Sequence, residues 1–304
     1  MQPIKLQEVL IEISQNCNLN CIMCGFTKEH NHSSKFISFD DFKIIFKKIK
    51  PFANLVRLNG RGESTIHKDF IKIFEYVAES YIDIALFSNF NFKNQKVIEM
   101  FLRTAPQLFV SMDSPNKTNL ESIRKGCKFE NIINNLTNLA ELQKRPFIVF
   151  TIQAQNLHEI QAIGELALKL QCNMIYNTIK QDINDKFRNY IESKISDIRD
   201  MFNIIKEQYN KTNLEVLIPD QIHGIQIFDS RISCGSKAHC PNIQNELCIQ
   251  YNGDVTPCNM FNPYKIGNIF THTLEEILYG KKMLHFLKTH KQNLYCKNCA
   301  CLKI

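Results

Sequence analysis

The chain has 304 residues, of which 44% are hydrophobic and 22% are charged, and Lys and Arg exceed Asp and Glu by 7. These values are typical of a globular protein with a large core, in one large domain or in one large and one small domain, and they exclude a disordered chain. No apolar stretch reaches the length of a membrane span. The basic residues are scattered, which favours a solvated surface and disfavours a nucleic-acid partner.

Cysteine is abundant, with 12 residues in the chain. The first residues lack the apolar segment of a signal peptide, so a secreted disulfide framework fits poorly. Thiolate–metal sites in a reducing compartment fit better, and we expect a cytoplasmic protein. Cys127 and Cys172 stand apart from the other thiols and are predicted to be buried as small hydrophobic residues.

Short β-rich runs alternate with amphipathic helical windows from residue 8 to about residue 180. Repeated β–α–β units build a parallel sheet, and ligands gather beyond the carboxyl ends of its strands. Asp40, next to Ser38, is the predicted N-cap of the first helix. The predicted strands are Val9–Ile13, Leu55–Asn59, Ile82–Ser88, Leu108–Met112, Phe147–Ile152 and Met174–Ile179. The predicted helices are Phe39–Ile49, Phe70–Ser80, Asn94–Thr104, Phe129–Lys144 and Leu157–Leu170.

Three cysteines follow the first predicted strand, at Cys17, Cys21 and Cys24. Three thiolates are one too few for a cubane of four irons, so one iron is left open for chemistry. A zinc site stays an alternative because His30 and His32 lie downstream, although zinc sites prefer paired C-x2-C units.

This C-x3-C-x2-C spacing resembles the signature of the radical S-adenosylmethionine (SAM) superfamily. The resemblance implies an α/β fold with a partial (β/α)6 parallel barrel, a [4Fe–4S] cluster held by the three cysteines, and SAM bound at the open iron. It implies cleavage of SAM to a 5′-deoxyadenosyl radical that abstracts a hydrogen atom, with reduced flavodoxin or ferredoxin as electron donor. Met23 stands where the family often has an aromatic residue and is expected to contact the adenine.

The segment after the second predicted strand also resembles a motif of this family. Gly60-Arg61-Gly62-Glu63 resembles its G-x-G-E-P sequence, with Ser64 in place of proline. Glycine lets a backbone approach a ligand closely. The resemblance implies that Gly60, Gly62 and Glu63 contact SAM, with Glu63 at its amino group.

Two later strand ends resemble further SAM-binding segments. The third strand ends in a sequence like the family's Thr-Asn-Gly, with Phe90 in place of glycine, and the fourth ends like its Ser-Leu-Asp-Gly, followed by Ile-Arg-x-Gly. Asp113 is an alternative turn cap, and a surface position for the arginine stays open. The implied SAM contacts are Ser88, Asn89, Ser111 and Arg124.

Polar residues after the fifth and sixth strands are candidates for contact with substrate, or else loop residues in water. Gln153 and Asn156 follow the fifth strand. The candidate bases for a substrate proton are Lys180, Asp182 and Arg61.

The last part of the chain holds seven cysteines beyond residue 230. Asn252-Gly253 is a strong hairpin signal, flanked by Cys248 and Cys258. Cys240 and Gly253 have the C-x9-15-G-x4-C spacing, ending at Cys258, that resembles the twitch form of the SPASM domain. The resemblance implies one auxiliary [4Fe–4S] cluster with the ligands Cys240, Cys258, Cys296 and Cys299. Cys234, Cys248 and Cys301 are alternatives as ligands, and a zinc site with four thiolates stays open.

The sequence thus predicts a radical SAM barrel over residues 1–182, a helical connector over 183–230 and a small α+β cluster-binding domain over 231–304. We expect oxidation of a small or carbohydrate-like substrate, with the auxiliary cluster as electron acceptor. The reason is that the residues before the first predicted strand are too few to form a peptide-recognition module. A maturase that modifies a ribosomally made peptide is the alternative, and an iron–sulfur or zinc protein is the non-enzymatic one.

Overall fold

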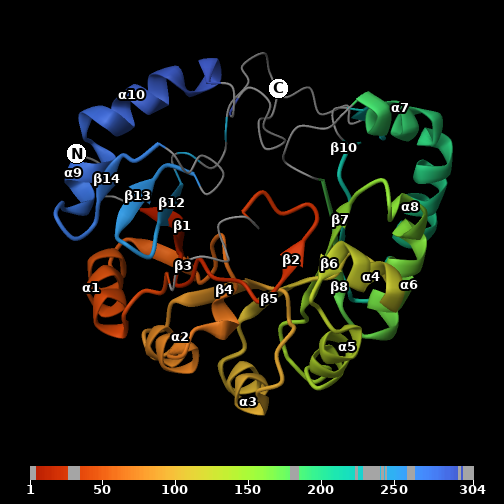
Figure 1. Cartoon of the computed structure of the whole chain (residues 1–304), viewed down its shortest axis with the longest axis horizontal. Helices are drawn as coiled ribbons and strands as arrows, with labels where there is room; N and C mark the ends of the chain where they lie inside the picture. Colours follow the sequence, from red (N-terminus) through yellow and green to blue (C-terminus); the bar gives the residue numbers. More distant parts are fainter. Residues whose placement is uncertain are drawn as a thin grey trace. The chain divides into compact units, whose positions relative to one another are not determined.

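The computed structural model describes residues 5–26, 35–178, 185–222, 225–228, 240, 243, 245–258, 264–293 and 296. The chain divides into two compact units, whose helices and strands are drawn in Figure 1. The first unit comprises Met1–Asn18, Lys28–Phe87 and Cys234–Ile304, and the second comprises Leu19–Thr27 and Ser88–Ser233. The predicted domain bounds at residues 182 and 230 stay a prediction.

A mainly parallel sheet forms the first unit. β1 (Leu6–Ile11) lies between β3 (Ala53–Arg57) and β12 (Glu246–Ile249) and runs parallel to both. β4 (Asp83–Ser88) runs parallel to β3 on its other side. The predicted hairpin is confirmed, because β13 (Asp254–Thr256) pairs antiparallel with β12 around Gly253, whose φ is 81°. The chain's last part therefore adds strands to the sheet that its first strands build; the remaining edge strand is β14 (Gly267–Asn268).

Helices α1 (Phe39–Ile49) and α2 (Phe70–Ala78) follow β1 and β3 along the chain and pack on each other. Four apolar residues of α1 are buried at helical spacing, as predicted: Phe42, Ile45, Phe46 and Ile49. The predicted N-cap was wrong by two residues. The Oγ of Ser38 accepts a hydrogen bond from the backbone N–H of Asp41 at 3.0 Å, and Asp40 lies in the first turn, where a negative charge is favoured.

Three short helices complete the described part of the first unit after β14. They are α9 (Leu274–Leu278), α10 (Lys281–Thr289) and the 3₁₀ turn η3 (His290–Gln292). A capping box begins α9: Thr273 accepts from the N–H of Glu276, whose carboxylate accepts from the N–H of Thr273 at 2.8 Å.

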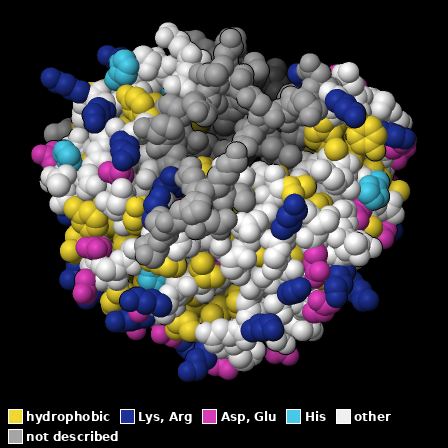
Figure 2. Space-filling model, in the orientation of Figure 1, with side chains coloured by type: hydrophobic (Ala, Val, Ile, Leu, Met, Phe, Trp, Pro, Cys, Tyr) yellow, Lys and Arg dark blue, Asp and Glu magenta, His cyan; other side chains and the backbone are white. Residues whose placement is uncertain are grey.

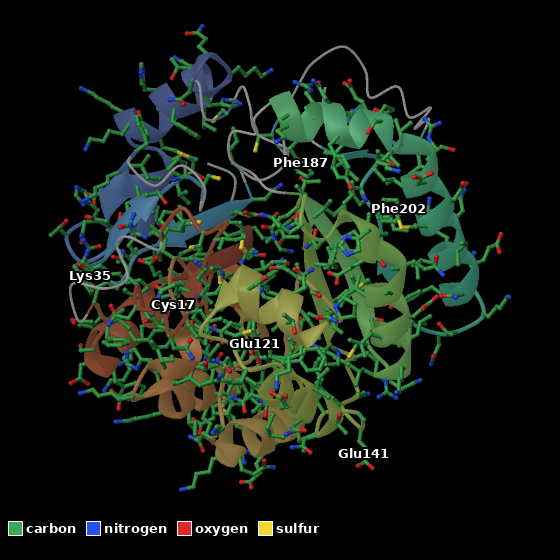
Figure 3. All side chains as sticks on the ribbon, turned by 45° about the vertical axis from the view of Figure 1, so that its right-hand side comes forward. Cys17, Lys35, Glu121, Glu141, Phe187 and Phe202 are labelled. Carbon is green, nitrogen blue, oxygen red and sulfur yellow. The ribbon has the colours of Figure 1, made fainter. Side chains whose placement is uncertain are left out.

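A parallel sheet also forms the second unit, in the order β5 (Gln107–Ser111), β7 (Phe147–Ile152), β8 (Asn173–Thr178) and β9 (Val216–Leu217). α8 (Ile195–Tyr209) lies between β8 and β9 in the chain and buries its apolar side. Phe202 of α8, labelled in Figure 3, meets Tyr176 of β8 with ring centroids 5.0 Å apart.

The remaining elements of the second unit include some that the sequence did not predict. The predicted windows hold α3 (Gln95–Thr104), α5 (Phe129–Thr137), η2 (Leu157–Glu159), α6 (Ile160–Lys169) and α7 (Asp185–Ser193). The helix predicted to end at Lys144 ends at Thr137. Beyond it, the backbone N–H groups of Leu139, Ala140 and Leu142 donate to carbonyls three residues back, as in a 3₁₀ turn. The unpredicted elements are α4 (Lys117–Ile123), β10 (Gln221–Ile222), β11 (Ile225–Gln226), and the paired strands β2 (Asn20–Cys21) and β6 (Arg124–Lys125).

These elements confirm the predicted class, an α/β fold whose six predicted strands are all parallel members of the sheets. None of the helices in the described part of the chain is long and apolar enough to cross a membrane. On the face in Figure 2, the described Lys and Arg side chains are interspersed with Asp and Glu, as expected of a solvated surface.

Candidate functional site

The cysteine loop begins in the first unit and continues in the second. Cys17 follows β1 in the first unit and is labelled in Figure 3. Cys21 and Cys24 belong to the second unit, and the N–H of Cys24 donates to the carbonyl of Cys21 at 3.2 Å. All three thiols are half-buried. Partly exposed thiols on a loop after a strand are suited to bind a cluster, because thiolates are the usual ligands of iron–sulfur centres.

A short antiparallel ladder fixes Cys21 in the second unit. Strands β2 and β6 place Cys21 opposite Arg124, and the N–H of Ile22 donates to the carbonyl of Ile123 at 3.0 Å. The Nη1 of Arg124 lies 4.0 Å from the Sγ of Cys21. Burial raises the pKa of the Cys21 thiol, and the positive charge of Arg124 offsets part of that rise. The ladder thus brings a guanidinium to a predicted cluster ligand.

Asp113 holds this arginine from the fourth predicted strand end. Its side chain is fully buried, and its Oδ2 lies 2.7 Å from the Nε of Arg124. Its Oδ1 accepts from the N–H of Thr151 at 2.7 Å. A buried carboxylate needs such partners, since a charge taken out of water is costly unless paired. Arg124 is only 8% exposed, so the alternative of a surface arginine is wrong, whereas its contact with SAM stays a prediction.

The side chain of Asn156 joins the ends of β5 and β7 by hydrogen bonds. It is fully buried, its Nδ2 donates to the carbonyls of Asp113 and Thr151 at 2.9 Å each, and its Oδ1 accepts from the N–H of Gln153 at 2.7 Å. These bonds use both ends of the amide. Asn156 therefore supports the loop that follows β7, and Gln153 in the same loop is also buried.

Ser88 and Asn89 are both buried and both shape the loop after β4. The Oγ of Ser88 accepts from the N–H of Phe90 at 3.0 Å, and the Oδ1 of Asn89 accepts from the N–H of Asn91 at 2.9 Å. Phe90 has a φ of 55°, the left-handed conformation that glycine adopts without strain. Its ring is fully buried and the Nδ2 of Asn135 donates to its carbonyl at 2.9 Å, which offsets the strain of a phenylalanine at the family's glycine position.

Ser111 is half-buried at the end of β5, where it pairs in register with Val149. Met23 is half-buried between two of the cysteines. Lys180 and Asp182 lie outside the described residues, as do Cys234, Cys299 and Cys301.

The Gly60–Glu63 segment of the first unit lies against the residues that precede Cys17. A Cβ on Gly62 would meet the carbonyl oxygen of Asn16 at 2.3 Å, and the N–H of Glu63 donates to that same oxygen at 2.7 Å. Contact with the cysteine-loop backbone therefore requires a glycine here. This differs from the expected reason, close approach to a ligand.

Glu63 begins the 3₁₀ turn η1 (Ser64–Ile66) and is 3% exposed. Its Oε1 accepts from the N–H and the Oγ1 of Thr65, at 3.1 and 2.7 Å. Ser64, which replaces the family's proline, donates from its buried hydroxyl to the carbonyl of Leu58 at 2.8 Å. This hydrogen bond holds the loop where the family has a rigid ring.

Arg61 donates hydrogen bonds from two of its guanidinium nitrogens to one carboxylate, that of Glu12. The Nε and Nη2 of Arg61 lie 3.0 and 3.1 Å from Oε2 and Oε1 of Glu12, whose side chain is 4% exposed. No sequence motif pointed to Glu12. A signal was present, since a charged residue within the apolar run Val9–Ile13 must find a partner if it is buried.

The described cysteines near the end of the chain gather around the hairpin. Burial raises the pKa of the Cys296 thiol, and Cys258 and Cys240 raise it further, so each of these two thiols lies within electrostatic reach of Cys296. Cys248 is buried in β12, and burial raises its pKa well above the ordinary value. Among the described residues, no group of three or more His, Cys, Asp or Glu side chains is arranged so that it could hold a metal ion. Three thiols in electrostatic reach fit a cluster by donor type, with further candidate ligands outside the described residues.

Two family models match the chain. The model of the radical SAM superfamily matches residues 11–167, and the model of the SPASM iron–sulfur cluster-binding domain matches residues 240–300. Among curated proteins, the antilisterial bacteriocin subtilosin biosynthesis protein AlbA of Bacillus subtilis (strain 168) is 20% identical over 95% of this chain and 62% of its own length. The chain thus spans less than two thirds of that relative.

Two solved structures share the fold over nearly the whole chain. SuiB of Streptococcus suis bound to SAM has a TM-score of 0.74 at 17% identity, over 98% of this chain and 71% of SuiB. Native anSMEcpe with bound SAM has a TM-score of 0.72 at 18% identity, over 97% of this chain and 86% of that protein. Both proteins have also been solved with peptides, SuiB with the precursor peptide SuiA and anSMEcpe with a Cp18Cys peptide. The likeness confirms the predicted partial-barrel fold.

Proposed function

The chain belongs to the radical SAM superfamily and carries a SPASM domain, and from this premise we propose that it modifies a polypeptide substrate by SAM-dependent hydrogen abstraction. Membership implies a SAM-binding [4Fe–4S] cluster, auxiliary cluster binding and SAM itself. The substrate class rests on one observation: AlbA, SuiB and anSMEcpe match nearly the whole chain, and the two solved structures do so with TM-scores of 0.74 and 0.72. BtrN, solved with 2-DOIA, covers 99% of this chain at a lower TM-score of 0.54, and an AdoMet-dependent heme synthase covers 88% of it at 22% identity.

This proposal takes up the peptide alternative from the sequence. The expected small or carbohydrate-like substrate rested on how few residues precede β1. Three proteins that match nearly the whole chain, a bacteriocin biosynthesis protein and two proteins solved with peptides, favour a polypeptide instead. Oxidation with the auxiliary cluster as electron acceptor, the flavodoxin or ferredoxin donor and the cytoplasmic location stay predictions.

The residues proposed to bind the cofactors are the ones that the family resemblance implies. Cys17, Cys21 and Cys24 would hold the first cluster, whose electron cleaves bound SAM to the radical that abstracts hydrogen. The proposed SAM contacts are Met23, Gly60, Gly62, Glu63, Ser88, Asn89, Ser111 and Arg124. Cys240, Cys258, Cys296 and Cys299 would hold the auxiliary cluster. The chain's task is to position SAM and substrate and to exclude water.

Anaerobically reconstituted, reduced protein tests the proposal. We expect it to form 5′-deoxyadenosine from SAM, and to form more when given the short peptide encoded beside its own gene, with a mass change in that peptide. Cleavage of SAM that responds to polyols or aminocyclitols but to no such peptide would contradict the polypeptide proposal and return the small-substrate prediction. No 5′-deoxyadenosine from protein with intact clusters would contradict the enzyme itself.

A further inference from the structure

We propose that Glu12 is a positioning residue that joins three segments of the first unit: the cysteine loop, the Gly60–Glu63 loop and the hairpin turn between β12 and β13. Through Arg61, the hairpin next to Cys248 and Cys258 then sets the geometry of the loop that binds SAM. The inference rests on the proposed function in one respect, namely that the Gly60–Glu63 loop contacts SAM.

The carboxylate of Glu12 accepts hydrogen bonds on both oxygens. Oε1 accepts from the Nε2 of Gln15 at 2.6 Å and from the Nη2 of Arg61 at 3.1 Å. Oε2 accepts from the backbone N–H of Arg61 at 2.9 Å and from its Nε at 3.0 Å. Gln15 stands two residues before Cys17, so this one side chain ties the cysteine loop to the backbone and side chain of the Gly60–Glu63 loop.

The hairpin turn contacts both members of the pair. The Oε1 of Gln250 accepts from the Nη2 of Arg61 at 3.1 Å, and the backbone N–H of Tyr251 donates to the carboxylate of Glu12. The backbone N–H of Glu12 donates to the carbonyl of Ile249 at 2.8 Å, which continues the parallel pairing of β1 with β12. A turn that carries no predicted SAM contact is therefore bonded directly to the residue between Gly60 and Gly62.

The neighbouring glycine shows how tightly the loop lies on this carboxylate. A Cβ on Gly60 would come within 2.4 Å of the Cγ and 2.7 Å of the Oε2 of Glu12. Real side-chain carbons do not approach so closely, so the loop backbone rests on Glu12 itself. Movement of the Glu12 side chain must move the loop.

Physical chemistry explains why the pair acts on geometry. A buried ion pair contributes little net stability, because desolvation offsets the attraction, but loss of one partner leaves an uncompensated buried charge. The bidentate guanidinium–carboxylate arrangement also fixes both planes. Without the Glu12 carboxylate, the Arg61 guanidinium is expected to move towards solvent, and the Gly60–Glu63 loop is expected to shift with it.

Glu8 and Arg57 supply a matched control within β1 and β3, the two strands that Glu12 and Arg61 follow in the chain. Their side chains form an ion pair between β1 and β3 and are 20% and 14% exposed. Arg57 lies within β3 rather than in the loop, and it pairs in register with Leu10. The control has the same chemistry without a loop to position.

The test compares Glu12→Gln, Gln250→Leu and Glu8→Gln in the reconstituted full chain. The readouts are the dissociation constant of SAM and the change that SAM causes in the electron paramagnetic resonance spectrum of the reduced cluster. We expect Glu12→Gln to weaken SAM binding about tenfold and to diminish the spectral change. Gln250→Leu should weaken SAM binding about threefold, in the range of one lost hydrogen bond, and Glu8→Gln should leave it within error.

Unchanged SAM affinity in Gln250→Leu, or equal weakening by Glu8→Gln and Glu12→Gln, would overturn the inference. Gln250→Leu keeps the test decisive if the Glu12 variant does not fold, because it removes no charge. Failure of the wild-type chain to bind SAM would instead contradict the proposed function, so the two failures are distinguishable.

Discussion

Each unit has a buried carboxylate–arginine pair, and the two pairs differ in what else they contact: one is bonded to Gln15, two residues before Cys17, and the other approaches the sulfur of Cys21. In the first unit, Glu12 binds Arg61 on two nitrogens and on its backbone N–H. In the second, Asp113 lies against the Nε of Arg124, whose Nη1 points to the sulfur of Cys21. The first arrangement fixes a loop backbone, whereas the second holds a positive charge at a thiol. The same residue types therefore serve geometry in one unit and electrostatics in the other.

The largest effect should come from the cysteines beside these pairs. Alanine at Cys17, Cys21 or Cys24 is expected to abolish SAM cleavage and to reduce iron from about eight to about four atoms per chain, because three thiolates hold the first cluster. The measurements are 5′-deoxyadenosine formation and iron content. Cys172→Ala is the matched control. This thiol is buried, as predicted, and burial raises its pKa to about 12, so it does not readily form the thiolate that binds metal. Cleavage that persists in all three variants would remove the basis of the comparison.

Asp113→Ala should cause the next largest effect. It leaves the Arg124 guanidinium buried without its carboxylate, so we expect the free energy of unfolding to fall by about 3–5 kcal/mol in chemical denaturation. Glu130→Ala, which breaks an exposed pair with Lys117, should leave it unchanged within error. Equal losses in the free energy of unfolding for the two variants would mean that burial does not determine how much the Asp113–Arg124 pair contributes to stability.

Arg124→Gln separates electrostatics from geometry. A positive charge near a cluster ligand favours the reduced cluster, so its removal should lower the reduction potential by about 60 mV, the equivalent of a tenfold change for one electron. Redox titration followed by electron paramagnetic resonance measures this shift. A potential that stays at the wild-type value would place Arg124 with Arg61, as a residue that acts on geometry alone.

A smaller effect concerns His67, just after the Glu63 turn. Its Nε2 lies 2.8 Å from the carbonyl of Ile37, its Nδ1 accepts from the N–H of Asp69 at 3.0 Å, and burial lowers its pKa from the ordinary 6.5. The folded protein thus binds this proton less readily than the unfolded chain. The contribution to stability is complete above about pH 6.5 and is lost as the pH falls below it, by at most about 1.4 kcal/mol per pH unit. Denaturation of wild type and His67→Gln between pH 5.5 and 7.5 measures it, and identical pH slopes would contradict it.

Much of this molecule could be predicted from local patterns. The six strands and the helices between them follow from apolar periodicity, the hairpin follows from Asn252-Gly253, and the cysteine spacing identified the family. Short elements such as β2, β6 and α4 escaped, since two to seven residues carry no measurable period. Phe90 shows a different limit, because only its positive φ explains how it occupies a glycine position.

The sequence by itself predicted which residues would bear the chemistry: the thiols, the Gly60–Glu63 loop and the arginine of Ile-Arg-x-Gly. Tertiary structure alone decided what those residues contact. Glu12 meets Arg61 49 positions away, and Arg61 meets Gln250 189 positions away. The physical reason is the parallel pairing of β1 with β3 and with β12, which brings to one edge residues that no local pattern connects. A charged residue in an apolar run predicts that a partner exists, but only the tertiary structure shows which residue that partner is.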